Sequence, residues 1–237
     1  MKTHEVVEAG EWVRARKALL EKEKEFTRAR DSLAAARREL PWKRVDKPYV
    51  FDTPTGEKTL GELFAGRSQL VVYHFMFAPD WTAGCKNCSF WADGFERMAV
   101  HLAARDVTLA AISRAPLAKL LAFEKRLGWS FTWVSSGRTE FNYDYGVSFD
   151  PARGPQEYNY EPKKGAATDL PGISVFHRDP GGVIHHTYST YGRGIDMMNP
   201  AYQWLDLVPK GRDEENLPFS MQWLRLRDEY GSGGTAA

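Results

Sequence analysis

The sequence contains little of several features that often decide what a protein does. Among its 237 residues there are two cysteines, and 32 basic residues stand against 31 acidic ones, which gives a formal net charge of +1. No stretch approaches the roughly 20 apolar residues of a membrane-spanning helix. The charge balance offers no basic surface for nucleic acid or for an acidic membrane. We therefore expect neither nucleic acid nor a membrane among the partners of this chain.

The first eight residues also lack the apolar stretch of a signal peptide. We therefore expect a cytoplasmic protein. In a reducing compartment, purely structural disulfides are rare, so a pair of cysteines favours catalytic or metal chemistry. The hydrophobic content of 43% and the aromatic content of 13% are ample for a globular domain with its own core.

Both cysteines lie in one short stretch, where two residues separate Cys85 from Cys88. The apolar and aromatic run 70–77 before them predicts a strand that is buried on both faces. After them, apolar residues recur at gaps of three and four, which predicts an amphipathic helix from 85 to 102. Cys85 would lie at the tip of this helix, where unpaired backbone N–H groups and the helix dipole stabilise a thiolate.

A strand, a short loop and a Cys-x-x-Cys that opens a helix form the dithiol arrangement of thioredoxin-like proteins. Because side chains at i and i+3 of a helix meet on one face, Cys85 and Cys88 can form and break a disulfide. Lys86 adds positive charge beside Cys85 and should lower its pKa, whereas Asp80 opposes this effect. Trp81 is placed to shield the pair from water.

A long helix is predicted over residues 11–40, which are rich in helix formers and end at Pro41. Its large apolar residues recur seven apart, which is the spacing of a coiled-coil stripe: Trp12, Leu19, Phe26, Leu33 and Leu40. Such a stripe needs a partner. Two partners fit it equally, namely the chain's own domain or a second copy in a homodimer.

The remainder alternates between strand and helix, which predicts an α/β protein with a central mixed sheet flanked by helices. The expected elements are strands at 107–112 and 131–134, a helix at 116–127, a hairpin of 173–177 with 183–188, and a last helix ending at 207. Residues 150–170 are expected to be a loop insertion. We divide the chain into an N-terminal helical extension (1–47), a main domain (48–208) and a C-terminal tail (209–237).

Four stretches together resemble the bacterial domain-of-unknown-function family 899, which is described as thioredoxin-like. They are residues 33–42, 74–77, 84–93 and 205–214. The resemblance covers essentially the whole chain. It implies a thioredoxin-like fold and a dithiol chemistry, but it implies no substrate.

The chain is also distantly similar to peroxiredoxins of the alkyl-hydroperoxide-reductase and thiol-specific-antioxidant class. Thr82 lies three residues before Cys85, as the threonine of that class does, whereas Pro79 lies six residues before it instead of seven. The similarity implies an alternative activity, a thiol peroxidase in which Cys85 attacks the peroxide and Thr82 orients it. That class also uses an arginine, for which the sequence offers Arg138, Arg153 and Arg178.

The thioredoxin fold normally has a cis-proline opposite the dithiol. Here Ile173 or Ser174 occupies that position, and Pro171 lies slightly too early. We therefore expect an altered substrate-binding edge at Ser174, and a cis bond before Pro171 stays an open alternative.

A Cys-x-x-Cys can also supply half of a zinc site. The sequence has no second such pair and no His-x3-His, and neighbours such as His185 and His186 point to opposite faces of a strand. We therefore predict no metal and no cofactor. His74, in the buried strand, is the histidine expected to point near the cysteine loop, unless it is only a hydrogen-bonded core residue.

The sequence thus predicts a thiol-disulfide oxidoreductase in which Cys85 attacks and Cys88 resolves. Its partner would be a protein or a small molecule that carries a thiol or a disulfide. The alternatives are the thiol peroxidase and a non-enzymatic protein, either metal-binding or a dimeric scaffold, in which the cysteines do no redox work.

Overall fold

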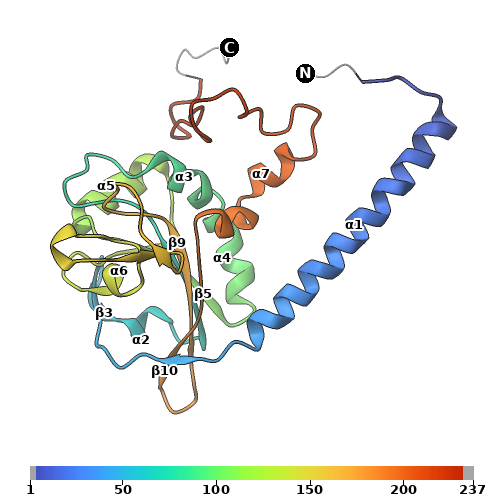
Figure 1. Ribbon diagram of the computed structural model, residues 1–237. Coiled ribbons are helices and arrows are strands. Elements are labelled where there is room, and N and C mark those ends of the chain that lie inside the picture. The colour runs from blue at the N-terminus through green and yellow to red at the C-terminus, as the bar shows by residue number, and fades with distance from the viewer. Residues whose placement is uncertain (1–3, 232–237) are drawn as a thin grey trace. The chain divides into compact units, whose positions relative to one another are not determined.

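The computed structural model describes residues 4–231 of the chain. The chain divides into two compact units, the first ending at Trp42 and the second beginning at Lys43. Residues 43–47, which the sequence analysis assigned to the extension, therefore belong with the main unit. The helices and strands carry the labels of Figure 1.

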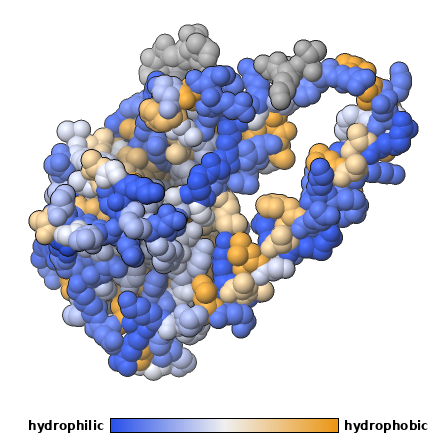
Figure 2. Space-filling model, in the orientation of Figure 1, coloured by the Kyte–Doolittle hydropathy of each residue, from blue (hydrophilic) through white to orange (hydrophobic). Residues whose placement is uncertain are grey.

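The first unit consists mainly of helix α1 (Ala9–Arg38), which has 30 residues and none of them buried. The predicted apolar stripe is exposed, with Trp12 at 59% and Phe26 at 65% of full accessibility. Figure 2 shows orange, hydrophobic patches between blue, hydrophilic ones along the helix. Local propensity and ion pairs such as Arg16–Glu23 and Lys24–Glu21 stabilise α1 within its own unit.

The second unit is built on a mixed sheet, in which eight strands of the described residues pair in the order β1-β10-β9-β4-β5-β6-β2-β3. Strand β4 (Gln69–His74) is central, and β5 (Val107–Ser113) and β6 (Thr132–Ser135) follow it in parallel. The remaining strands of this sheet are β1 (Lys43–Arg44), β2 (Val50–Thr53), β3 (Gly56–Thr59), β9 (Gly172–Arg178) and β10 (Ile184–Tyr191).

The topology around β4 is that of a thioredoxin-like fold. Helices α3 (Lys86–Ala92) and α4 (Phe95–Ala103) connect β4 to the parallel strand β5, and α4 runs beside β5 in Figure 1. On the other side of β4, strands β9 and β10 form an antiparallel hairpin. The predicted mixed α/β fold with a long N-terminal helix is therefore confirmed.

Two hydrophobic cores cover the two faces of the sheet. We call one the cysteine face, since its core contains Cys88 together with Tyr73 and Phe75. We call the other the histidine face, where the His74 ring lies beside Phe141 and the core is formed by residues such as Phe51, Leu70, Val72, Phe141 and Phe176. Successive side chains of a strand point to opposite faces, so the neighbours Tyr73 and His74 belong to different cores.

The helix predicted from 85 to 102 is in fact two helices, because the chain breaks at Asp93 and Gly94 between α3 and α4. The Asp93 carboxylate accepts a hydrogen bond from the indole of Trp129 at 2.9 Å. Glycine lowers helix stability, and the aspartate is engaged by a tertiary contact. The apolar stripe still packs inward from both pieces, with Trp91 and Phe95 each 4% exposed.

The other elements complete the two layers around the sheet. The helices are α2 (Leu60–Leu63), α5 (Leu117–Leu127), α6 (Phe141–Asp144), α7 (Pro200–Leu205) and the 3-10 turns η1 (Pro151–Arg153) and η2 (Gly192–Met198). The expected loop insertion at 150–170 also holds a small hairpin of β7 (Glu157–Tyr158) and β8 (Glu161–Pro162). No helix within residues 4–231 is long and apolar enough to cross a membrane.

The C-terminal segment 209–231 was predicted as a tail of undefined structure. It contains no regular helix or strand, but Leu224 is fully buried and Leu226 is 5% exposed. Leu226 belongs to the core of the cysteine face, and Met221 and Trp223 pack against that core. The described part of this segment is therefore an integral part of the second unit.

Candidate active site

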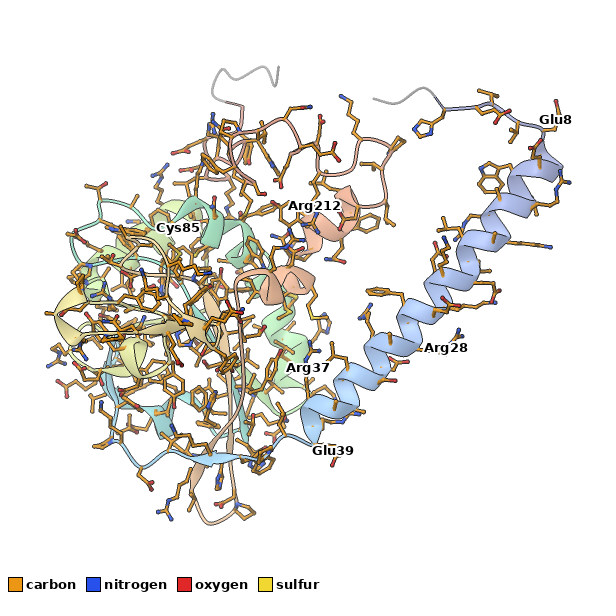
Figure 3. All side chains as sticks on the ribbon, viewed as in Figure 1. Glu8, Arg28, Arg37, Glu39, Cys85 and Arg212 are labelled. Atoms are coloured by element: carbon orange, nitrogen blue, oxygen red, sulfur yellow. The ribbon has the colours of Figure 1, made fainter. Side chains whose placement is uncertain are left out.

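The two cysteines lie where the loop after β4 enters helix α3. Cys85 is the N-cap residue of α3, and its backbone N–H donates to the carbonyl of Met76 at 3.0 Å. Figure 3 shows Cys85 at the start of this helix. Gly84 allows the loop to pass close to the core, because a Cβ there would lie 2.8 Å from Cε1 of Phe75. The local sequence thus fixes Cys85 at the helix tip, as predicted.

Cys85 is partly exposed and its pKa is lowered to about 7. The main cause is a hydrogen bond from the Cys88 thiol, and the backbone N–H groups of Cys88 and Asn87 and the charge of Lys86 act in the same direction, against the effect of burial. Backbone N–H groups in the first turn have no partner within the helix, so they are free to stabilise a thiolate. Near neutral pH, a substantial fraction of Cys85 is therefore ionised.

Cys88 is only 2% exposed, and burial raises its pKa well above the ordinary value. Its sulfur accepts a hydrogen bond from the backbone N–H of Met76 at 3.4 Å. Both cysteines are free thiols in this structure. Burial favours the protonated form of Cys88, so the thiolate of the pair forms on Cys85 first.

Lys86 points away from the cysteines toward the C-terminal segment. Its ammonium group donates to the carbonyls of Leu224 at 2.8 Å and of Gln222 at 3.2 Å. Its charge still lowers the pKa of Cys85, although it is the last of the causes in size. The sequence did not reveal that Lys86 binds the C-terminal segment, because its acceptors are main-chain carbonyls more than 130 residues away.

Trp81 and Thr82 lie in the loop that precedes the helix. Trp81 is half-buried against the core of the cysteine face, and Thr82 is exposed. The Thr82 hydroxyl makes no hydrogen bond within residues 4–231. Lys119 of α5, which the sequence analysis did not single out, holds this loop by donating to the carbonyls of Pro79 at 2.7 Å and of Trp81 at 2.9 Å.

His74 and Ser174 do not join the cysteines. His74 is 1% exposed on the histidine face, and its Nε2 is 2.8 Å from Oγ of Ser174. A chain of hydrogen bonds continues from Ser174 to Ser189 at 2.8 Å and from Ser189 to His186 at 2.7 Å. The expectation that His74 points near the cysteine loop is wrong, because Tyr73 packs in the core with Cys88 and the neighbouring side chain of the strand then points to the opposite face.

The buried histidine is kept neutral. Burial, assisted by His186, lowers the pKa of His74 to about 3. At neutral pH its imidazole is therefore part of a polar core network, which is the second interpretation that the sequence allowed.

The edge near Pro171 differs from the usual thioredoxin arrangement. None of the peptide bonds between the described residues is cis, that before Pro171 included. The Pro171 carbonyl accepts a hydrogen bond from the Tyr158 hydroxyl at 2.7 Å, and that hydroxyl accepts one from the backbone N–H of Gly192 at 2.8 Å. Tyr158, from the loop insertion, thus organises this edge.

The three arginines that the sequence offered for peroxide binding are all engaged elsewhere. Arg138 pairs with Asp52 and Glu57, and Arg153 pairs with Glu140 and stacks on Tyr143. Arg178 donates to the carbonyls of Gly61 and Arg67. None of the three reaches the cysteine loop.

A metal site has little support in the geometry. Nowhere in the described part of the chain do three or more histidine, cysteine, aspartate or glutamate side chains gather closely enough to hold a metal ion. His185 lies 3.3 Å from Asp179, and His186 is bound to Ser189. Among residues 4–231, the cysteine pair belongs to no such group.

Comparison with known proteins places the chain in a family. Residues 1–230 match the model described as bacterial protein of unknown function (DUF899). The chain belongs to this family. The resemblance to DUF899 that the sequence motifs indicated is thus confirmed, and none of the curated proteins matches the chain.

Solved structures similar to this DUF899 chain include peroxiredoxins. Peroxidoxin BcpB from Mycobacterium tuberculosis has a TM-score of 0.47 at 14% identity, covering 67% of this chain and 93% of that one. A cysteine-to-serine mutant of peroxiredoxin Q from Xanthomonas campestris has a TM-score of 0.45 at 15% identity, covering 72% and 98%. A hypothetical protein from Sinorhizobium meliloti 1021 has a TM-score of 0.37 at 12% identity, covering 62% and 72%.

Proposed function

We propose that this protein is a thiol-disulfide oxidoreductase that uses Cys85 as its nucleophile and Cys88 as its resolving thiol. The observation that carries the proposal is the unequal state of the two sulfurs. Cys85 is partly exposed at a helix N-cap with a pKa of about 7, whereas Cys88 is buried and protonated and donates to it. The accessible sulfur can attack as a thiolate, and the buried sulfur stays a thiol until the second step, as a two-step exchange requires.

In the first step, the Cys85 thiolate attacks one sulfur of a substrate disulfide. A bond forms between Cys85 and that sulfur, the substrate S–S bond breaks, and one substrate thiolate leaves. In the second step, Cys88 loses its proton and attacks the sulfur of Cys85, which expels the second substrate thiolate. The substrate disulfide has then gained two electrons, and the protein carries a Cys85–Cys88 disulfide.

The thiol peroxidase uses the same nucleophile and is distinguished by its first product. There Cys85 would attack a peroxide oxygen to give a sulfenic acid and release hydroxide or alkoxide, and Cys88 would condense with it to a disulfide and water. Thr82 is exposed and makes no hydrogen bond within residues 4–231, and Arg138, Arg153 and Arg178 are paired elsewhere. The geometry around Cys85 therefore favours exchange with disulfides.

The test is a redox titration of the wild type, Cys85→Ser and Cys88→Ser in dithiothreitol and glutathione buffers, with alkylated thiols counted by intact mass. The wild type should show one reversible two-electron transition between roughly −120 and −270 mV. Cys88→Ser should accumulate a mixed disulfide on Cys85, and Cys85→Ser should form none. Thiols that stay reduced across this range would overturn the proposal.

A parallel assay with hydrogen peroxide separates the two activities. The oxidoreductase should reduce a disulfide substrate with turnover and consume peroxide only at the slow rate of an ordinary thiolate. Turnover with peroxide and none with disulfides would replace the proposal with the thiol peroxidase. The carrier of electrons to the Cys85–Cys88 disulfide is expected to be another thiol, since the proposed cycle uses only sulfur chemistry.

A further inference from the structure

The proposed exchange requires Cys88 to become an anion inside the protein. Cys88 must be a thiolate when it resolves the mixed disulfide, and it is the leaving thiolate when a reductant attacks Cys85 in the oxidised protein. Yet the side chain is 2% exposed in an aromatic core, and burial disfavours its charged form. A buried anion of this kind needs hydrogen-bond donors directed at it.

One donor is already in place, the backbone N–H of Met76 at 3.4 Å from the Cys88 sulfur. The neighbouring hydroxyls are mostly committed to other acceptors. The Tyr158 hydroxyl donates to Pro171, and the Ser89 hydroxyl donates to the carbonyl of Cys85 at 3.0 Å. The site therefore needs a further donor that has no other acceptor.

The Tyr73 hydroxyl meets this requirement. Tyr73 is 1% exposed, belongs to the same core as Cys88, and its hydroxyl has no hydrogen-bond partner of good geometry among the described residues. Tyr73 packs in the same core as Cys88, and it lowers the pKa of that thiol. A buried hydroxyl without a partner costs stability, so its presence against a reacting sulfur calls for an explanation.

We propose that the Tyr73 hydroxyl is a preorganised donor that stabilises the Cys88 thiolate during resolution and during reduction of the disulfide. The inference rests on the oxidoreductase function proposed above. In the resting dithiol the hydroxyl makes no hydrogen bond of good geometry, and it would gain a charge-assisted one when Cys88 carries negative charge. An interaction that is made only in the reacting state lowers the free-energy barrier of the step and does not stabilise the resting state.

The proton that leaves the Cys88 thiol can be accepted without a further protein side chain. The substrate thiolate released in the first step takes the proton from the Cys88 thiol, directly or through solvent. The Cys88 thiolate, held by Tyr73 O–H and Met76 N–H, then attacks the Cys85 sulfur and expels the second substrate thiolate. Tyr73 keeps its own proton throughout, because burial and the two cysteines raise its pKa well above the ordinary value.

The two steps can be timed separately with 5,5′-dithiobis(2-nitrobenzoate) in a stopped-flow instrument. Attack by Cys85 releases one coloured thiolate, and resolution by Cys88 releases a second. For Tyr73→Phe we expect the first phase to change less than twofold and the second to slow about tenfold at pH 7, as for loss of a hydrogen bond to a charged group. The pH midpoint of the second phase should also rise.

Tyr202→Phe is the matched control. Tyr202 belongs to the same core and is 2% exposed, but its hydroxyl donates to the Glu214 carboxylate at 2.7 Å. This variant should keep both phases and lose thermal stability, whereas Tyr73→Phe should melt at or above the wild-type temperature in the reduced state, because it removes an unsatisfied hydroxyl.

The outcomes separate the two proposals. If wild type releases both thiolates and Tyr73→Phe shows the same second phase, the role of Tyr73 is refuted and the oxidoreductase stands. An equal slowing in Tyr73→Phe and Tyr202→Phe would refute it as well, since that result reflects packing alone. If the wild type never releases the second thiolate, the oxidoreductase itself fails.

Discussion

The cysteine face and the histidine face of the sheet receive the side chains of two adjacent residues of β4, Tyr73 and His74. The two faces differ in how the ionisation of their buried groups is controlled. On the histidine face, His74 is hydrogen-bonded to Ser174 through Nε2, and its Nδ1 has no partner among the described residues. Burial lowers the pKa of this ring to about 3. On the cysteine face, the Tyr73 hydroxyl is likewise unpartnered within residues 4–231, beside a thiol pair whose two pKa values move apart. Burial is common to both faces.

What distinguishes the cysteine face is the helix that begins there. Burial by itself suppresses ionisation, and His74 shows the result, a group that stays neutral at and around neutral pH. A hydrogen bond from the Cys88 thiol, assisted by the backbone N–H groups at the start of α3, reverses this effect for Cys85 alone. A reactive group therefore requires both enclosure and a set of donors directed at one atom.

The first prediction concerns packing on the histidine face. Phe141 is fully buried there, against Tyr49, Phe51 and Phe176. Phe141→Ala should lower the free energy of unfolding by about 3–5 kcal/mol, as other large-to-small core substitutions do. The pKa of Cys85 should stay near 7, which urea denaturation and pH-dependent alkylation can measure on the same samples. A changed Cys85 pKa would mean that the two faces are coupled.

The second prediction concerns pH. The folded-state pKa of His74, about 3, lies below the ordinary 6.5, so the unfolded chain binds the proton first as pH falls. The contribution of His74 to stability is therefore complete above about pH 6.5 and is lost as pH falls toward 3. Between pH 7 and pH 5 this single group should account for a loss of about 2 kcal/mol in the free energy of unfolding.

His74→Phe is the variant that isolates this effect. The new ring fits between Phe141 and Tyr145, which already flank the imidazole, and Ser174 keeps its bond to Ser189. Urea denaturation gives the free energy of unfolding of wild type and variant at pH 7 and pH 5. Between these pH values the wild type should lose about 2 kcal/mol more than the variant. Identical pH dependence would show that His74 is not buried in neutral form.

The smallest predicted effect is on the cysteine face and concerns chemistry. Cys88→Ala removes the largest cause of the low Cys85 pKa, whereas Cys88→Ser keeps a donor at the same position. The alanine variant should be alkylated by iodoacetamide roughly five- to tenfold more slowly than the serine variant at about pH 6.5, because fewer of its Cys85 side chains are thiolates. Equal rates in the two variants would assign the low pKa to the helix alone.

Much of the fold followed from periodicity. The apolar run 70–77, the stripe after Cys85 and the alternation of strands with helices predicted β4, the inward face of α3 and α4, and the mixed sheet. These features repeat about every two or every 3.6 residues, so neighbouring residues are enough to recognise them.

The errors concern features that depend on contacts between distant residues. The break between α3 and α4 involves Trp129 binding Asp93, and the C-terminal segment is ordered by burial of Leu224 and Leu226. The side on which His74 lies depends on the packing of Tyr73 in the core with Cys88. Strand alternation gives two equivalent choices, and tertiary packing selects one of them.

The attachment of Lys86 to the C-terminal segment has a consequence for biosynthesis. Lys86 and its acceptor Gln222 are 136 residues apart, so at roughly 5–20 residues per second the acceptor is synthesised about 7 to 27 s after the lysine. During that interval α3 and its cysteines are made, but Leu226, which shares the core of Cys88, is not. The core on the cysteine face can therefore be completed only at the end of synthesis.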